Sequence, residues 1–287
     1  MNDEGGGELA SESEFRRRSY MSENQDELLT ERWDRVVALT LNRPERLNAL
    51  SERMCCALAA ALEKAGKDSG IRAIILRGAG GSFCAGGDVK QMGRDIDDGR
   101  PAAFFGSPLD AIHAAAIAIR HVEKPVIAAL QGAVAGAGLN LALCCDYRIA
   151  AENAVLIQAF TNIGLVPDTG GTFLLPRLVG FAKATQLLFE GRPVDAWEAE
   201  QLRLVDRVVP LTELEAATNA LASSLAARPT RALGLTKRLL NESVVNTFEQ
   251  QLDAERQIQQ ILGADSADFV EGVRAFLERR RARFIGQ

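Results

Sequence analysis

The chain contains 287 residues, 47% of them hydrophobic, which is enough to bury the core of one large domain or of two small ones. Its formal net charge of −5 argues against a general nucleic-acid binder, because such proteins normally carry a basic face. Five cysteines are too few for a disulfide scaffold, and two histidines do not suggest a histidine-rich metal site. We therefore expect a cytoplasmic protein without a metal ion.

The N-terminal residues 1–28 are predicted to be a disordered polar tail. They contain a triple glycine at 5–7 and a triple arginine at 16–18, and no apolar segment follows the basic run. A secretory signal needs an apolar stretch after its positive charges, so we do not expect one here. Either Met1 or Met21 could be the natural start.

One uncharged stretch, residues 126–145, is long enough to cross a membrane. It contains Gln131, Asn140 and three glycines, which disfavour a helix surrounded by lipid. We interpret it as a buried strand, a glycine turn and a buried helix, and we expect no membrane partner.

The hydrophobic pattern alternates between strands and helices up to about residue 210. Strands are predicted at 35–41, 71–76, 125–130, 147–150 and 206–209. Helices are predicted at 50–65, with Ser51 as N-cap, and at 138–145, 170–179 and 182–189. This alternation predicts an α/β fold in which helices cover a sheet.

From residue 211 onward only helices are predicted, with interruptions near 228–229 and 262–263. These helices have apolar faces of their own, which include Leu235, Phe248 and Phe276. Such faces must be buried against the back of the core or against a partner subunit.

Several familiar catalytic motifs are missing from the sequence. The phosphate loop GxxxxGK[ST], the nucleophile elbow GxSxG and the zinc motif HExxH do not occur. Gly136-Ala137-Gly138 begins like a dinucleotide-binding loop, but Leu141 occupies the position of its third glycine. We therefore do not expect a nicotinamide or flavin enzyme.

Two glycine-rich turns, residues 80–89 and 132–138, each follow a predicted strand. Small residues let a ligand approach the backbone closely, and the second turn opens a helix whose first N–H groups have no partner in the helix. Two such turns side by side could direct two amides at one oxygen, as in an oxyanion hole. Tight packing of strands against helices would favour the same small residues, so both interpretations stay open at this point.

Three segments in order resemble signatures of the crotonase, or enoyl-CoA hydratase/isomerase, superfamily: residues 83–92, 124–151 and 164–172. Residues 164–177 and 267–277 are most similar to the phenylacetate-pathway isomerases that rearrange ring epoxides. The resemblance implies a core of repeated ββα turns over residues 29–210 and a helical region, 211–287, that forms trimers or dimers of trimers. It also implies an acyl-CoA thioester as substrate, with no separate cofactor.

The resemblance further assigns the residues of the site. The amides of Gly87 and Ala137 would bind the thioester oxygen. The substrate and its coenzyme A arm would be lined by Arg46, Ala49, Ala85, Asp88, Val89, Lys90, Gly136, Asn140 and Phe160. Arg43, Arg46 and Lys90 could contact its phosphates, although solvent exposure is an equal alternative for each of them.

Two departures from the family pattern bear on the reaction. Hydratases of this family use two glutamates to hold and deprotonate a water molecule, and the corresponding positions here are Asn140 and Phe160. Neither side chain exchanges a proton at neutral pH, and Phe160 would exclude water. Addition of water by the usual route is therefore not expected.

An acid remains at Asp168, where family members that isomerise, dehalogenate or rearrange acyl-CoA carry an aspartate. Among apolar neighbours its pKa would be raised, which suits a group that takes and returns one proton. The alternative role is capping of the helix that begins near residue 170. Three functions follow: an isomerase with Asp168 as acid and base, a hydratase with displaced acids, or an inactive acyl-CoA-binding trimer.

Other polar and aromatic residues receive structural interpretations. His113 and His121 lie on a predicted helix as surface or satisfied side chains, and Asp146 fixes a turn or a salt bridge. Phe104 and Phe105 follow a Gly/Asp-rich stretch, residues 93–101, that could form a mobile lid over the acyl group.

Overall fold

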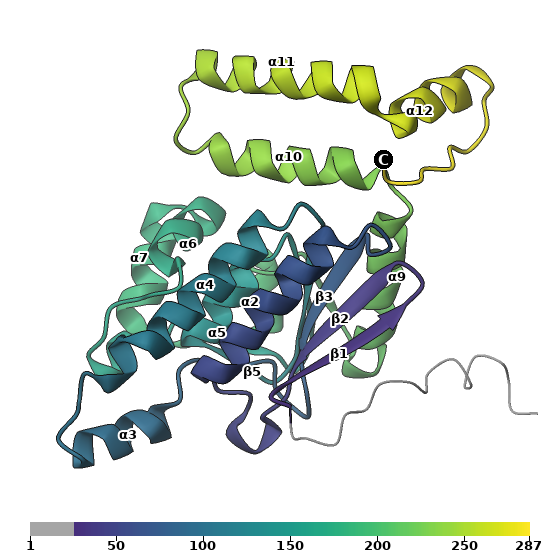
Figure 1. Cartoon of the computed structure of the whole chain (residues 1–287). Helices are drawn as coiled ribbons and strands as arrows, with labels where there is room; N and C mark the ends of the chain where they lie inside the picture. Colours follow the sequence, from purple (N-terminus) through teal and green to yellow (C-terminus); the bar gives the residue numbers. More distant parts are fainter. Residues whose placement is uncertain (1–25) are drawn as a thin grey trace, which may run out of the picture.

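A six-stranded sheet forms the centre of the computed structural model, which describes residues 26–287 (Figure 1). In spatial order its strands are β1 (Leu28–Trp33), β2 (Val36–Leu41), β3 (Ala73–Gly78), β4 (Val126–Leu130), β6 (Tyr147–Ala151) and β9 (Arg207–Val209). Only the pairing of β1 with β2 is antiparallel within this sheet. The predictions for residues 1–25, including a start at Met21, lie outside the described residues.

Helices cover both faces of the sheet, which explains why β2 is buried at every position. On one face, α9 packs its alanines against Val36, Ile75 and Ile127. The larger core on the other face lies under α2, α4 and α5. The helices are α2 (Glu52–Lys67), α3 (Val89–Asp97), α4 (Ser107–His121), α5 (Gly136–Cys144), α6 (Gly171–Val179), α7 (Phe181–Glu190), α8 (Ala196–Gln201), α9 (Leu214–Ala226), α10 (Thr230–Glu242), α11 (Phe248–Asp265) and α12 (Ala267–Leu277).

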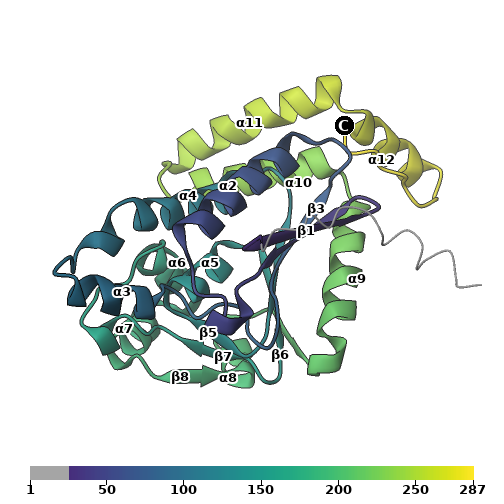
Figure 2. The same cartoon turned by 60° about the horizontal axis from the view of Figure 1, so that its bottom comes forward.

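A second, smaller sheet lies beside the main one and was not predicted (Figure 2). It contains β5 (Ala133–Ala135), β7 (Val155–Ile157) and β8 (Pro193–Asp195). β5 lies within the glycine-rich turn 132–138 and β8 begins with a proline, so these short segments carry no clear strand signal. Short 3₁₀ turns complete the chain: η1 (Pro44–Arg46), η2 (Ala103–Phe105), η3 (Thr161–Ile163) and η4 (Leu211–Glu213).

Most predicted elements are confirmed, and two boundaries are not. The uncharged stretch 126–145 forms β4, a turn with β5, and α5, and within residues 26–287 no helix is long and apolar enough to span a membrane. Strand β1 begins at Leu28, inside the predicted tail. The break predicted near 262–263 is wrong, because α11 continues to Asp265 and Ser266 then caps α12. A single glycine costs a helix only about 1 kcal/mol, which α11 tolerates at Gly263.

Helices α10, α11 and α12 form a separate layer beyond the sheet and its covering helices (Figure 1). Buried Lys237 of α10 attaches this layer, because its Nζ donates to the Ile119 carbonyl at 2.7 Å and pairs with the Asp146 carboxylate at 2.8 Å. The predicted salt bridge of Asp146 is thereby confirmed. Much of the apolar surface of α11 and α12 stays exposed, with Phe248 at 74% and Phe276 at 83%.

The attachment of α10 gives a first prediction. A Cβ at Gly234 would lie 2.2 Å from the Glu123 carbonyl oxygen, whereas one at Gly263 would meet nothing within 4 Å. We expect Gly234→Ala to destabilise the fold by about 1–3 kcal/mol through overpacking. Gly263→Ala should stabilise it by up to about 1 kcal/mol through helix propensity. Urea unfolding measures both, and equal effects of the two substitutions would contradict this packing.

Candidate active site

The two glycine-rich turns pack against each other through their backbones. Gly86 has a φ of +90°, and a Cβ there would lie 2.7 Å from the Ala135 carbonyl oxygen. A Cβ at Gly138 would lie 2.6 Å from the Cys84 sulfur. Cys84 also exchanges backbone hydrogen bonds with Ala133 and Ala135 at 3.0 and 2.9 Å. The small residues therefore serve close approach of one turn to the other.

This packing places two candidate amides in neighbouring turns. Ala137 is the second residue of α5, where N–H groups have no partner inside the helix. A Cβ at Gly86 would lie 3.3 Å from the Ala137 nitrogen, and Gly87 follows directly in the chain. The arrangement agrees with the requirement of an oxyanion hole for two adjacent donors. Joint binding of a thioester oxygen by Gly87 and Ala137 stays a prediction.

Apolar side chains surround these amides. A Cβ at Gly87 would lie 2.8 Å from Met92 Cε and 3.0 Å from the ring of Phe104, so both residues lie against this turn. Phe104 is buried and meets Phe105 edge to face. On the other turn, the Phe160 ring lies 3.9 Å from a Cβ built at Gly136. Part of the predicted lid stretch, residues 93–101, is helix α3, which ends at Asp97.

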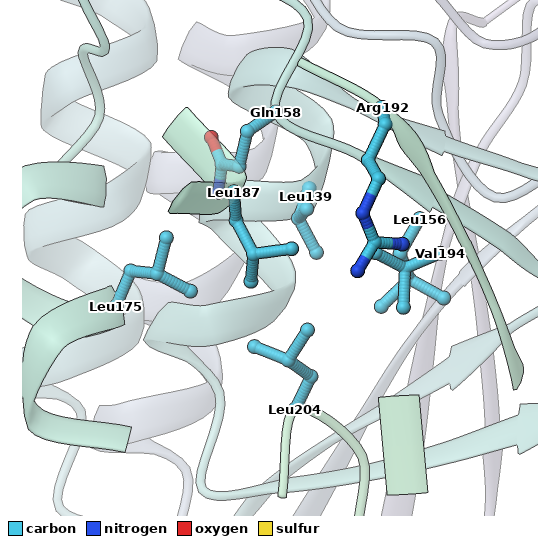
Figure 3. Close-up of a pocket in the computed structure, with 8 residues that line it drawn as sticks. All are labelled: Leu139, Leu156, Gln158, Leu175, Leu187, Arg192, Val194 and Leu204. Atoms are coloured by element: carbon cyan, nitrogen blue, oxygen red, sulfur yellow. The ribbon is translucent and has the colours of Figure 1, made fainter. Parts of the chain in front are cut away.

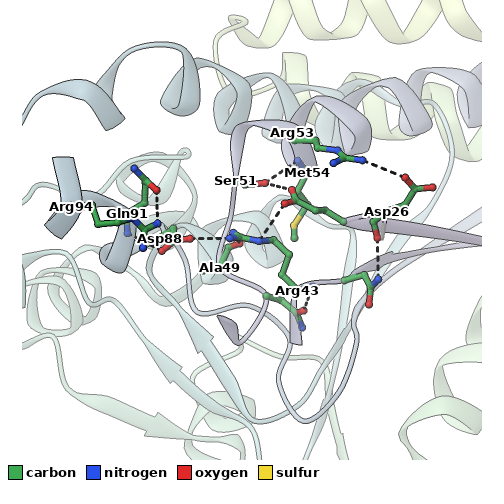
Figure 4. A network of polar contacts seen from close by, with 12 residues as sticks. Asp26, Arg43, Ala49, Ser51, Arg53, Met54, Asp88, Gln91 and Arg94 are labelled. Atoms are coloured by element: carbon green, nitrogen blue, oxygen red, sulfur yellow. Dashed lines mark hydrogen bonds and ion pairs between the residues drawn. The ribbon is translucent and has the colours of Figure 1, made fainter. Parts of the chain in front are cut away.

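Arg43 and Asp88 hold the first turn in place (Figure 4). The buried Asp88 carboxylate accepts from the Gln91 amide at 3.0 Å, which caps α3, and pairs with Arg43 Nη2 at 3.0 Å. Arg43 also donates to the Ala49 carbonyl at 2.7 Å. Burial by itself raises the pKa of Asp88, but the bonds from Gln91 and Arg43 outweigh it, so the pKa is lowered. The structure thus gives both charged side chains a role within the protein.

The other residues expected to line coenzyme A lie along the edge of this turn. Leu50 N–H donates to the Gly86 carbonyl at 2.7 Å, and Ala85 N–H to the Leu47 carbonyl at 2.9 Å, which brings the loop after η1 beside the turn. Ala49 belongs to this loop and Arg46 is the last residue of η1, whereas Val89 and Lys90 are exposed at the start of α3. Their contacts with coenzyme A remain predictions.

Asn140 is fully buried and connects α5 to the segment that carries Asp168. Its Nδ2 donates to the Asp168 carbonyl at 2.8 Å, and its Oδ1 accepts from Gln158 Nε2 at 2.8 Å. A Cβ at Gly171 would lie 2.4 Å from Asn140 Nδ2, so glycine is needed there for this contact. The amide therefore contacts the Asp168 backbone from the position to which the resemblance assigns a glutamate in hydratases.

Gln158 is a buried residue that the sequence analysis did not identify. It lines a small, mostly apolar cavity of about 10 Å³ with Leu139, Leu156, Leu175, Leu187, Arg192, Val194 and Leu204 (Figure 3). Within residues 26–287 its Oε1 has no hydrogen-bond partner. The cavity has room for roughly one water molecule, which could satisfy such an acceptor. The only sequence signal was a glutamine directly after the apolar strand β7.

Asp168 has a half-buried carboxyl group, and its backbone carbonyl contacts Asn140. Burial raises its pKa, against the opposing effects of a 2.7 Å bond from the Thr169 hydroxyl and of His113 nearby. The raised pKa expected from the sequence is thereby confirmed in direction. The capping alternative is wrong, because the N-cap of α6 is Gly170 and no side chain caps this helix. The Asp168 carboxyl therefore does not cap α6, and its catalytic role stays a prediction.

The four buried cysteines do not offer an alternative nucleophile in the described structure. Cys55, Cys84, Cys144 and Cys145 are buried, and only Cys56 is exposed. Burial raises the pKa of Cys84 to about 12 and that of Cys144 to about 11. A thiol must lose its proton to act as a nucleophile, so these two stay inert at neutral pH.

Residues 31–287 match the family model described as enoyl-CoA hydratase/isomerase. The chain belongs to the enoyl-CoA hydratase/isomerase family. It is 42% identical over 253 residues to 1,2-epoxyphenylacetyl-CoA isomerase of Escherichia coli strain K12, covering 88% of this chain and 95% of that protein. It is 40% identical to a probable enoyl-CoA hydratase of Rhodobacter capsulatus, with 88% and 95% coverage.

Solved structures of enoyl-CoA hydratases share the fold. The putative enzyme from Streptomyces coelicolor A3(2) superposes with a TM-score of 0.85 at 32% identity, covering 94% of this chain and 98% of that one. The enzyme from Polaromonas sp. JS666 gives 0.83 at 34% identity, with 90% and 99% coverage. The resemblance to the crotonase superfamily and the expected fold are confirmed.

The raised pKa of Asp168 predicts a specific effect of pH on the stability of this family member. Between the usual aspartate pKa and the raised one, the folded state binds more protons than the unfolded state, so Asp168 destabilises the fold increasingly as pH rises. Asp168→Asn removes this contribution. Its melting temperature relative to the wild type should rise as the pH increases above the usual pKa of an aspartate. The exposed Glu255→Gln of α11 is the control, and a difference independent of pH would contradict the shift.

Proposed function

We propose that this protein is an acyl-CoA isomerase that moves a proton through a thioester enolate, with Asp168 as acid and base. The observation that carries the proposal is the half-buried Asp168 carboxyl, which has a raised pKa and does not cap the helix beside it. A proton next to a thioester carbonyl is only weakly acidic, so its removal needs a nearby base and a stabilised oxyanion. One carboxyl that accepts the proton and returns it at another carbon suffices for isomerisation.

Gly87 and Ala137 would supply the oxyanion stabilisation. Their turns are held together by close backbone contact, so two amide donors require little rearrangement when the charge develops. Each donor of this kind contributes about 2.7–4 kcal/mol in characterised oxyanion holes. The surrounding Met92, Phe104 and Phe160 lower the local dielectric, which strengthens both bonds.

Asn140 and Phe160, at the positions where hydratases carry glutamates, support isomerisation over hydration. Asn140 donates to the Asp168 backbone and accepts from Gln158, so its amide is engaged within the protein. Phe160 puts an apolar ring against the second glycine turn. A site with one carboxyl and these neighbours suits an unsaturated or ring-epoxide acyl-CoA, as the name of the Escherichia coli relative suggests. This would place the protein in fatty-acid or phenylacetate catabolism.

Hydration with displaced acids is the second candidate, because relatives at 40% identity are named probable enoyl-CoA hydratases. Incubation with crotonyl-CoA in ¹⁸O-labelled water separates the two reactions. A hydratase places labelled oxygen in the product, whereas an isomerase does not. Binding of acyl-CoA without turnover across straight-chain enoyl, dienoyl and aromatic-ring substrates would instead favour the inactive binding protein.

The substitution Asp168→Asn tests whether the carboxyl takes part in catalysis. Asp168→Asn should lower turnover of the preferred acyl-CoA at least about a hundredfold, the usual contribution of an acid–base group, with KM nearly unchanged. Steady-state kinetics across the acyl-CoA panel measures this effect, and Glu255→Gln on α11 is the matched control. Unchanged turnover by Asp168→Asn would remove the carboxyl from the mechanism.

We also propose that the protein forms a homotrimer or a dimer of trimers through its C-terminal helices. The support is the exposure of Phe248 on α11 and of Phe276 on α12, since large exposed apolar surface often marks an interface. Phe248→Asp combined with Phe276→Asp should reduce the mass measured by light scattering, whereas the exposed Gln257→Asp should not. An unchanged mass for the double variant would contradict the assignment.

A further inference from the structure

The chain just after Asp168 adopts a strained backbone conformation. Thr169 has a φ of +54°, in the left-handed region that β-branched residues rarely enter, and it is only 2% exposed. Gly170 follows with a φ of +80°, so two consecutive residues are left-handed before α6 begins. Strain of this kind persists only where the surrounding structure imposes it.

Side chains of α5 and α4 form hydrogen bonds with this turn. From α5, Asn140 Nδ2 donates to the Asp168 carbonyl at 2.8 Å, and Gln158 fixes that amide from the opposite side at 2.8 Å. From α4, His113 Nε2 accepts a long hydrogen bond from the Thr169 N–H, at 3.5 Å. The turn therefore has one side-chain donor at its carbonyl and one side-chain acceptor at its next amide.

Within the turn, the conformation of Thr169 determines the direction of the Asp168 carboxyl group. The Thr169 hydroxyl donates to Asp168 Oδ1 at 2.7 Å, so the orientation of the carboxyl follows the conformation of Thr169. If Thr169 relaxed to an ordinary negative φ, its hydroxyl and the attached carboxyl would turn with it. A displacement of about 1 Å at a reacting group can cost about a hundredfold in rate.

We propose that His113 and Asn140 are positioning residues, a clamp from α4 and α5 that holds Thr169 left-handed and thereby aims the Asp168 carboxyl at the substrate. This inference rests on the proposed function of Asp168. In this contact His113 Nε2 is the acceptor and the Thr169 N–H is the donor. The ring acts through Thr169, and it does not itself exchange a proton with the substrate.

Substitutions that keep or remove a single hydrogen-bonding atom test the clamp. His113→Gln keeps an acceptor at about the place of Nε2, whereas His113→Leu keeps bulk without an acceptor. Asn140→Asp keeps the shape of Asn140 but cannot donate to the Asp168 carbonyl when ionised. His121, the exposed second histidine of α4, gives the control variant His121→Leu.

The kinetic readout is conversion of trans-3-hexenoyl-CoA to the conjugated trans-2 isomer, followed by ultraviolet absorbance. His113→Leu and Asn140→Asp should lower kcat about tenfold or more with KM changed less than about twofold, because geometry is lost and binding is not. His113→Gln should recover kcat to within about threefold of the wild type. A His113→Gln variant as inactive as His113→Leu would overturn the positioning role.

Hydrogen exchange supplies a readout that does not depend on turnover. In the full-length protein, the Thr169 amide should exchange faster in His113→Leu than in His113→Gln, while amides of α11 should not differ. Equal exchange at Thr169 in the two variants would overturn the clamp.

The failure of this inference is distinguishable from that of the proposed function. An inactive Asp168→Asn together with a fully active His113→Leu overturns the clamp alone. Full activity of Asp168→Asn overturns the proposed function and the clamp with it.

Discussion

The close contact between two glycine turns determines where everything else in the site can lie. Gly86 lies against Ala135, and Gly138 lies against Cys84, at distances that leave no room for a Cβ atom. Because each turn follows one of two neighbouring parallel strands, β3 and β4, the sheet itself delivers both turns to the same edge. A single methyl group in this contact would separate the turns and the amides of Gly87 and Ala137 with them.

The position of Asn140 shows how one residue can change the chemistry of the site in two ways. An ionised glutamate only accepts hydrogen bonds, whereas an amide donates and accepts at once. Asn140 uses both functions, toward the Asp168 carbonyl and from Gln158. The residue that the resemblance places at an acid of the hydratases thus also contacts the backbone of Asp168. In the proposed mechanism, the loss of one proton carrier and the positioning of another are coupled in this single side chain.

The sequence predicted those features that leave a local pattern. Strands β2, β3 and β4 are runs of branched and aliphatic residues, and the glycine turns stand out by composition. Strand β1 is an exposed edge strand, and β5, β7 and β8 have three residues each. None of these four strands shows the periodicity of a buried strand. His113 and Gln158 act through single contacts to residues far along the chain, at Thr169 and Asn140. Such contacts exist only after folding, which is why His113 was expected to be a surface or satisfied side chain and Gln158 was not identified from the sequence.

The burial of four cysteines has a practical consequence for following the protein in solution. The thiols of Cys84 and Cys144 are enclosed and keep their protons at neutral pH, whereas Cys56 on α2 is exposed. A maleimide dye would therefore react at one place on the folded protein without any engineered residue. Energy transfer between dyes at Cys56 of separate copies would then report how those copies are arranged.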